Sequence, residues 1–281
     1  MKAMLDTIVD YQLRELILVP PLFIRLVQDA IVNQYDLTCV RRFSSGAAPL
    51  PPRVIEQLQE KFPWTGFKQG YGMTESCSCL TAHSPDNYDY EYSDTVGTIL
   101  PSTELKFMDV RGNEVGEGEI WARGPQCAMG YVDNPQASIE TFGRDGWLRT
   151  GDIGRMLANG CVQITGRIKE MVKVKGVGVA PAELEELLLT HPKVLDVAVI
   201  GKPDDYTGER PHACVVTATG ILPSRKLCDE LIKFVQGRKM RSKWIHGVTF
   251  ITSVPKAGSG KILRRELKTH LSDLQIPIAK I

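Results

Sequence analysis

The beginning of the chain alternates between helical and strand-like patterns of hydrophobic positions. Apolar residues three and four positions apart predict helices at 3–11, 20–31 and 54–62. Short apolar runs between these segments predict strands at 16–19, 40–44 and 66–70. Since helices that alternate with strands cover the faces of a sheet, we expect an α/β arrangement in this part of the chain.

From Asp94 onward the pattern changes to short segments separated by glycine and proline. Strands are predicted at 104–110, 118–123 and 161–165, and helical periodicity nearly vanishes. This pattern of short strands predicts a small barrel-like β unit over 94–166.

The last part of the chain returns to a mixed pattern. A helix is predicted after Pro181, because proline is favoured in a first turn and acidic residues follow it. A second helix at 227–235 and strands at 194–200, 212–217 and 248–254 are also predicted. We therefore expect a mixed α/β and α+β fold with two domains, a large one over 1–167 and a small α+β one over 168–281.

Composition narrows the function classes. A formal net charge of +1 over 281 residues gives no sign of a nucleic-acid or membrane surface. No apolar run approaches the roughly 20 residues of a transmembrane helix, so we expect a soluble protein. The seven cysteines are scattered, without a secretory leader or zinc-ligand spacing, which favours a reducing compartment. The five histidines show no spacing typical of a hydrolase triad.

The segment Gly70-Tyr-Gly-Met-Thr-Glu75 has the residues of a phosphate-binding corner. Its glycines allow backbone amides to approach a phosphate, Thr74 adds a hydroxyl, and the Glu75 carboxylate can hold magnesium. The alternative is an ordinary strand-to-helix turn with Thr74 as a cap. For this hexapeptide alone, the two interpretations stay balanced.

Arg149-Thr-Gly-Asp152 places a carboxylate in a predicted turn. Two carboxylate oxygens suit the two neighbouring hydroxyls of a ribose. The alternative is an aspartate that satisfies its own turn, which is the better interpretation for an isolated Thr-Gly-Asp.

Four cations follow at alternating positions in Gly166-Arg-Ile-Lys-Glu-Met-Val-Lys-Val-Lys-Gly176. A continuous strand would place them on one face, where they could meet phosphates. The alternative is a solvated strand face. The four cations are Arg167, Lys169, Lys173 and Lys175.

Lys261 ends the flexible segment Ala257-Gly-Ser-Gly260. A long ammonium on such a loop could neutralise charge that develops between a carboxylate and a phosphate. The segment is no Walker loop, because Pro255 stands where the first glycine should be and Ile262 replaces the Ser/Thr. A plain basic tail is the alternative.

These four motifs, in this order, resemble the adenylate-forming superfamily, especially its acyl-CoA and coumarate-CoA ligase branch. That family opens its nucleotide site with a Ser/Thr/Gly-rich loop ending in Pro-Lys-Gly, and no such stretch precedes Tyr71. We therefore expect the chain to be the carboxy-terminal half of a truncated ligase. Such a half could pair with a missing amino-terminal half, and we expect it to adenylate poorly alone.

The resemblance implies roles for particular residues. The implied catalytic residues are Lys261, Lys173 and Glu75, with Glu75 as the magnesium ligand. The implied AMP, acyl and CoA contacts are Ala47, Gln69, Gly70, Tyr71, Thr74, Asp152, Arg167, Lys175 and Gly176, and the implied hinge is Lys169. Gly178 stands where coumarate-CoA ligases carry glutamine, which puts the tuning of the second half-reaction in doubt.

The function implied is that of an ATP-dependent acid-CoA ligase. Such an enzyme uses ATP and Mg²⁺ to convert a carboxylic acid into an acyl-AMP, and CoA then takes the acyl group. Two alternatives stay open, a non-catalytic nucleotide- or CoA-binding remnant and an adenylation module that loads a carrier protein. The final tripeptide Ala279-Lys280-Ile281 is similar to peroxisomal import signals, which predicts a peroxisomal location and otherwise a cytoplasmic one.

Overall fold

The computed structural model describes residues 1–143, 145–274 and 276. The described chain divides into two compact units, which we describe separately. The first comprises Met1–Ile164 with Gly258–Gly260, and the second comprises Thr165–Ala257 with the residues from Lys261 onward. The predicted boundary at residue 167 stays a prediction, and the Ala279-Lys280-Ile281 signal lies outside the described residues.

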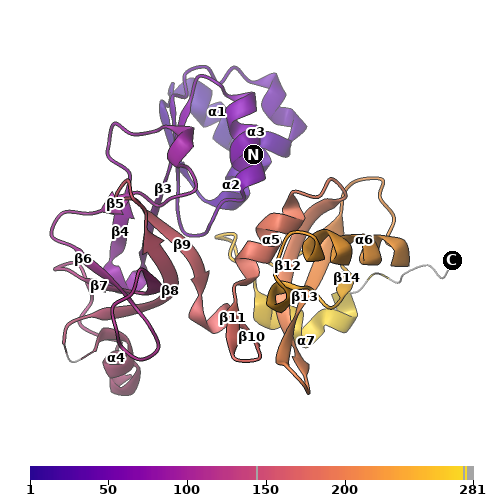
Figure 1. Ribbon diagram of the computed structural model, residues 1–281. Coiled ribbons are helices and arrows are strands. Elements are labelled where there is room, and N and C mark those ends of the chain that lie inside the picture. The colour runs from indigo at the N-terminus through magenta and orange to yellow at the C-terminus, as the bar shows by residue number, and fades with distance from the viewer. Residues whose placement is uncertain (144, 275, 277–281) are drawn as a thin grey trace. The chain divides into compact units, whose positions relative to one another are not determined.

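A five-stranded sheet in the order β1-β2-β3-β4-β5 organises the start of the first unit (Figure 1). The strands are β1 (Glu15–Leu18), β2 (Arg42–Ser45), β3 (Gly66–Met73), β4 (Ser78–Ala82) and β5 (Thr98–Ile99). The first three are parallel, whereas β4 pairs antiparallel with β3 and β5. The helices are α1 (Lys2–Asp10), α2 (Pro20–Gln28) and α3 (Pro52–Lys61). Their apolar faces share one core with the parallel strands, around Phe23, Phe43 and Phe67, which confirms the predicted α/β arrangement.

The β-rich segment forms an open sheet. Its strands, in sheet order, are β6 (Glu104–Met108), β7 (Glu117–Arg123), β8 (Leu148–Met156) and β9 (Val162–Arg167). The prediction of a barrel-like unit is therefore wrong, because these four strands do not close on themselves. Helix α4 (Pro135–Phe142) was not predicted; it begins where the Asn134 side chain accepts a hydrogen bond from the Ala137 amide.

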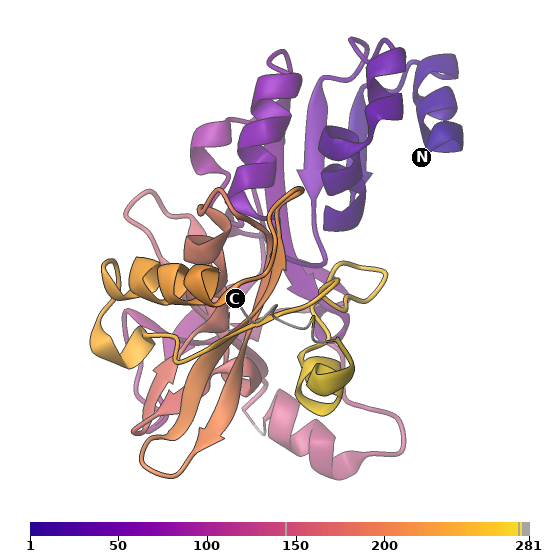
Figure 2. The same ribbon diagram turned by 90° about the vertical axis from the view of Figure 1, so that its right-hand side faces the viewer.

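The second unit contains a sheet with helices on both faces (Figure 2). Its strands are β10 (Val172–Val174), β11 (Val177–Val179), β12 (Val194–Asp204), β13 (Gly208–Thr217) and β14 (Val248–Phe250). Its helices are α5 (Pro181–Leu189), α6 (Arg225–Gln236) and α7 (Arg264–Leu274). Alternate residues of β12 point to opposite faces: Val197 and Val199 pack with α5 and α6, while Ala198 and Ile200 pack with α7.

Short 3₁₀ turns complete the described secondary structure. They cover Ala30–Gln34, Thr74–Ser76, Tyr90–Tyr92, Ile168–Glu170 and Arg241–Lys243. Among the described residues, no helix has both the length and the apolar character needed to span a membrane.

Candidate functional site

The candidate site begins at the carboxyl edge of the first sheet. Ser45 of β2 lies beside Gln69 of the parallel strand β3, so the residues that follow both strands share one edge, where α/β sheets bind ligands. Ala47 follows β2 with a left-handed φ of 72°, which is uncommon for a residue with a Cβ. The Gln69 side-chain amide donates to the carbonyl oxygen of Ser93 at 2.6 Å.

Beyond this edge, β3 enters an irregular antiparallel pairing with β4. The register shifts between Tyr71 and Gly72. A Cβ at Gly72 would lie 1.8 Å from the carbonyl oxygen of Ser78, whereas one at Gly70 would stay 3.5 Å from its nearest neighbours. Only glycine permits the approach at position 72, so this residue fixes the path of the chain into the next turn.

Thr74 and Glu75 lie in the 3₁₀ turn directly after β3. Ser76 is buried in this turn, and its hydroxyl donates to the carbonyl oxygens of Met73 and Ser78 at 3.1 and 2.7 Å. Thr74 is exposed. The alternative in which Thr74 serves as a cap is wrong, because Met73 occupies the N-cap position.

Glu75 is held at both its backbone and its carboxylate. The Ala128 amide donates to the Glu75 carbonyl oxygen at 2.8 Å. The phenol of Tyr131 donates to Glu75 Oε1 at 2.6 Å. This hydrogen bond to the carboxylate, with some burial, raises the pKa of Tyr131. The interaction fixes the orientation of a carboxylate that the sequence had singled out.

The residues around Glu75 fit one kind of metal site. Magnesium usually takes one or two protein carboxylates and completes its shell with phosphate oxygens and water. No group of three or more His, Cys, Asp or Glu residues suited to a metal occurs in the described part of the chain. The single fixed carboxylate of Glu75 has the chemistry to supply the protein's share of such a shell.

The sequence predicted a turn at Asp152. The structure instead places Asp152 at a bulge within β8. Glu119 pairs with Ile153, and Trp121 pairs with Arg149. The segment 150–152 therefore opposes a single residue of β7. Bulges of this kind redirect side chains and are common beside active sites.

Local hydrogen bonds hold the bulge in place. The Thr150 hydroxyl donates to the Ile120 carbonyl oxygen at 2.7 Å and accepts from the Asp152 amide at 3.1 Å. The Gly151 amide donates to Glu119 Oε1 at 3.1 Å, and Gly151 has a φ of 72°. Asp152 itself is only 5% exposed.

One contact joins the two parts of this site. The Tyr71 phenol donates to Asp152 Oδ2 at 2.9 Å. The first unit thus brings together the edge of β3, the Thr74–Glu75 turn and the Asp152 bulge. A buried carboxylate with an ordered phenol partner and a neighbouring turn can bind a polar ligand that carries both hydroxyl groups and charge.

The remaining predicted residues belong mainly to the second unit, and they do not form the predicted row of cations. The turn Ile168–Glu170 interrupts the strand between Arg167 and Lys173, so the prediction of one continuous strand face is wrong. Lys169 lies within that turn. Lys173 is exposed on β10, and its amide donates to Glu209 Oε2 at 2.9 Å.

Lys175 and Gly176 form the tight turn between β10 and β11. Both have positive φ values, 51° and 79°. The Lys175 amine lies 4.0 Å from the centroid of the Tyr206 ring, and its amide donates to the Thr207 carbonyl oxygen at 2.8 Å. The predicted CoA contacts therefore lie on an exposed, well-defined hairpin.

Lys261 lies in a loop that is closed at its base. The Ala257 amide donates to the Lys261 carbonyl oxygen, and the Leu263 amide donates to the Pro255 carbonyl oxygen, both at 2.9 Å. Arg264 follows Leu263 directly and begins α7. Only 14% of its side chain is exposed. The alternative of a plain basic tail is therefore wrong for this segment.

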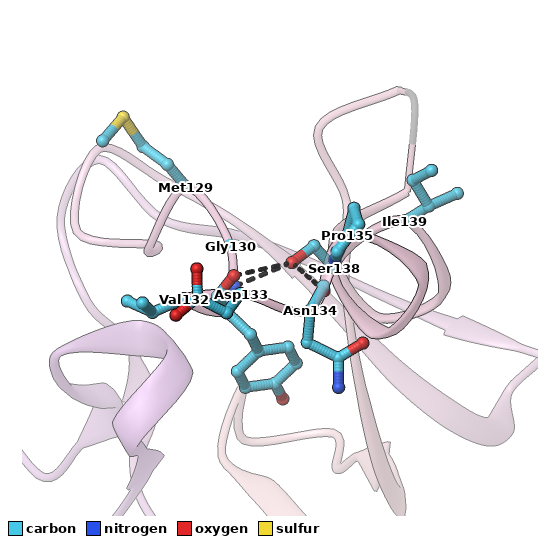
Figure 3. Close-up of a pocket in the computed structure, with 9 residues that line it drawn as sticks. Met129, Gly130, Val132, Asp133, Asn134, Pro135, Ser138 and Ile139 are labelled. Atoms are coloured by element: carbon cyan, nitrogen blue, oxygen red, sulfur yellow. Dashed lines mark hydrogen bonds between the residues drawn. The ribbon is translucent and has the colours of Figure 1, made fainter.

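An open pocket of about 550 Å³ lies beside α4 (Figure 3). Ser138 orders its wall, since its hydroxyl accepts from the Tyr131 amide and donates to the Asn134 carbonyl oxygen, both at 2.8 Å. None of the predicted site residues lines this pocket. Its connection to the candidate site runs through Tyr131 and Glu75.

Three residues shape the site in ways that the sequence did not predict. Tyr131, Glu119 and Thr150 contact Glu75, Gly151 and Asp152, respectively. Tyr131 and Glu119 lie far in sequence from the residues that they contact, and the contact of Thr150 depends on the bulge in β8. In the sequence, Tyr131 is only an aromatic residue that follows Gly130 in a loop. This pattern does not by itself predict its contact with Glu75.

Two family models match the chain. The model of the AMP-binding enzymes matches residues 1–132, and the model of the AMP-binding enzyme C-terminal domain matches residues 183–261. Among curated proteins, 4-coumarate-CoA ligase 1 of Narcissus pseudonarcissus is 41% identical over 90% of this chain and 47% of its own length. Peroxisomal OPC-8:0-CoA ligase 1 of Arabidopsis thaliana is 40% identical over 95% of this chain and 49% of its own. The chain spans about half the length of these relatives.

Solved structures of similar proteins show the same fold. The amide bond synthetase McbA of Marinactinospora thermotolerans matches with a TM-score of 0.84 and 28% identity, over 95% of this chain and 55% of that one. The anthranilate CoA ligase AuaEII in complex with anthranoyl-AMP matches with a TM-score of 0.84 and 27% identity, over 97% and 53%. With the two family models and the curated relatives, these structures show that the chain belongs to the adenylate-forming superfamily of AMP-binding enzymes and is similar to its acyl-CoA synthetases.

Proposed function

We propose that this chain provides the nucleotide-binding part of an ATP-dependent acid-CoA ligase. The observation that carries the proposal is the buried Asp152 carboxylate, which Tyr71 orients beside the turn of Thr74 and Glu75. The names of the curated relatives, which are CoA ligases, support it. The substrates would be a carboxylic acid, ATP and CoA.

In this proposal each element of the first unit has one task. Asp152 accepts hydrogen bonds from the ribose hydroxyls, because its two oxygens match a vicinal diol. Thr74 donates its hydroxyl to a phosphate oxygen. Glu75 would hold magnesium, which when bound supplies positive charge to the phosphates. Ala47, Gln69 and Gly70 would form the wall beside the adenine and acyl groups.

Cations of the second unit would serve the two half-reactions. A carboxylate that attacks a phosphate brings anions together, so a positive charge stabilises the transition state. We assign this role to Lys261. Lys173 and the turn of Lys175 and Gly176 would act when CoA takes the acyl group, and Lys169 would be the hinge between the two arrangements.

The proposal is tested by AMP binding to the purified chain, measured by calorimetry. Asp152→Asn should weaken AMP binding at least roughly tenfold, because the ribose would lose its charged acceptor. Asp109→Asn is the matched control, since Asp109 accepts from the amides of its own turn at Arg111 and Asn113. If both variants bind AMP as the natural chain does, Asp152 is a structural aspartate and the proposal fails.

A peroxisomal location belongs to the same proposal. Its support is the name of the Arabidopsis relative together with the Ala279-Lys280-Ile281 ending. Deleting this tripeptide from a fluorescently tagged chain should abolish peroxisomal import. An unchanged distribution would refute the assignment.

A further inference from the structure

Arg264 connects two segments of the second unit that the proposed function treats separately. Its Nε donates to Glu170 Oε2 at 2.8 Å, while its two Nη atoms form a fork with Glu185. Nη1 also donates to the carbonyl oxygen of Val199 at 3.1 Å. Only 14% of the Arg264 side chain is exposed. Charged hydrogen bonds of this bidentate kind are strong and directional.

On one side, Arg264 anchors the loop that carries Lys261. It directly follows Leu263, whose amide closes the base of that loop on Pro255. The opposite strand of the loop base is anchored as well, because Lys256 Nζ lies 2.6 Å from Asp196 Oδ2 on β12. The base of the Lys261 loop therefore belongs to the rigid body built on β12.

On the other side, Arg264 holds Glu170, the residue directly after Lys169. Glu170 ends the 3₁₀ turn, and the following Met171 amide bonds back to the carbonyl oxygens of Arg167 and Ile168 at 3.2 and 3.3 Å. The Glu170 carboxylate is fixed to the guanidinium group of Arg264, the residue that directly follows the base of the Lys261 loop. Because Arg264 holds the Glu170 side chain, torsional change during a domain rotation would have to occur before Glu170, at the end of this short turn, and it would open the bonds of the Met171 amide.

We propose that Arg264 is a positioning residue that clamps Glu170 to the base of the Lys261 loop, so that a rotation at Lys169 carries Lys261 with it as one body. The functional meaning of Lys169 and Lys261 rests on the proposed function. The clamp itself rests only on the contacts of Arg264 within the second unit.

Amide hydrogen exchange of the purified full chain tests the clamp at Met171. Glu170→Ala removes the carboxylate but leaves the pair of Arg264 with Glu185, so the unit should remain folded. We expect exchange at the Met171 amide to accelerate by roughly threefold or more. Glu170→Gln keeps an acceptor oxygen for Arg264, so its acceleration should be smaller.

Arg264→Lys provides the second arm, because lysine keeps the charge but lacks the guanidinium fork. It should also accelerate exchange at Met171. The double variant with Glu170→Ala should be no faster than the faster single variant, since both remove the same contact. Should Arg264→Lys unfold the unit, the Glu170 variants decide alone.

Glu183→Ala is the matched control. Glu183 is a partly buried carboxylate of the same unit that pairs with Lys239 and Lys243, both at 2.7 Å, and it does not contact Arg264. The clamp is overturned if Glu170→Ala leaves exchange at Met171 unchanged, or if Glu183→Ala accelerates it equally. AMP binding does not enter this readout, so failure of the clamp and failure of the proposed function can be told apart.

Discussion

The phenol of Tyr71 and the carboxylate of Asp152 are hydrogen-bonded at 2.9 Å although 81 positions separate them in the chain. Tyr71 belongs to the first sheet and Asp152 to the bulge of the second. The bond therefore ties together the two sheets of the first unit at the place where a ligand is proposed to bind.

Replacing Tyr71 with phenylalanine should weaken both the fold and the site. The buried Asp152 would lose a hydrogen bond, which costs about 1–2 kcal/mol in the free energy of unfolding. AMP binding should fall several-fold because the carboxylate is no longer oriented. Urea unfolding and calorimetry measure the two effects.

Tyr35→Phe is the control for this prediction. Tyr35 donates to Asp6 at 2.7 Å, but 38% of the Asp6 side chain is exposed, so water can replace the phenol. The Tyr35 variant should lose less than half as much stability and bind AMP normally. Equal losses in both variants would contradict a special role for Tyr71.

Gly72→Ala should strongly destabilise the first unit. The added Cβ would lie 1.8 Å from the Ser78 carbonyl oxygen and 2.7 Å from the Cys79 Cα. Since only backbone movement relieves such a clash, we expect a loss of about 3 kcal/mol or more. Gly116→Ala should stay within about 0.5 kcal/mol, because no atom lies within 4 Å of its added Cβ. Thermal unfolding of both variants checks this difference.

The sequence predicted those elements whose hydrophobic period is clear. Helix α3 follows from Val54, Ile55 and Leu58, which share one buried face, and β12 follows from its apolar run. Helix α4 was not predicted because Phe142 is its only buried residue, so it has no hydrophobic period. The sequence features that favour this helix are local: Asn134 at the N-cap position and the proline that follows it.

The candidate site could be predicted as a set of residues but not as a geometry. The glycine positions and the acidic residues indicated nucleotide chemistry. The bulge that aims Asp152 depends on pairing with β7, and the interruption at Ile168–Glu170 depends on local turn formation. Neither leaves a periodic trace in the sequence.

His212 should make the second unit sensitive to acid. Burial, with a smaller effect of Lys202, lowers the pKa of His212 from 6.5 to about 4. The unfolded chain therefore takes up a proton first, so stability is full above the unfolded pKa and is lost as the pH falls toward 4. Between about pH 7 and pH 5 this linkage amounts to about 2 kcal/mol.

His212→Gln should remove this part of the acid dependence. Glutamine can still bond the Thr249 hydroxyl, which lies 2.8 Å from His212 Nε2. Urea unfolding at both pH values should show a smaller loss for the variant. His83, His191 and His246, whose pKa values are also lowered, chiefly by burial, provide the acid dependence that remains. An unchanged pH profile would contradict the assignment.

Cysteine alkylation should report nucleotide binding. Cys77 and Cys79 are exposed beside the Thr74–Glu75 turn, whereas Cys214 is buried, and burial raises its pKa to about 11. N-ethylmaleimide should label the first two rapidly and Cys214 last, because the thiolate is the nucleophile. Saturating AMP should slow the labelling of Cys77.

The half-buried Cys39 is the internal control for that experiment. It lies in the same unit, between α2 and β2, and its labelling rate should not respond to AMP. Mass spectrometry of the alkylated peptides gives each rate separately. If AMP binds without slowing Cys77, the nucleotide does not lie over this turn.

The bulge in β8 also determines how the first unit would select among ligands. Because Thr150 and Glu119 hold the backbone around Asp152, the conformational entropy of placing this carboxylate is lost during folding and not during binding. A preorganised acceptor of this kind favours a rigid vicinal diol over a sugar that offers one hydroxyl. The same chain should therefore discriminate against 2′-deoxynucleotides without any dedicated steric gate.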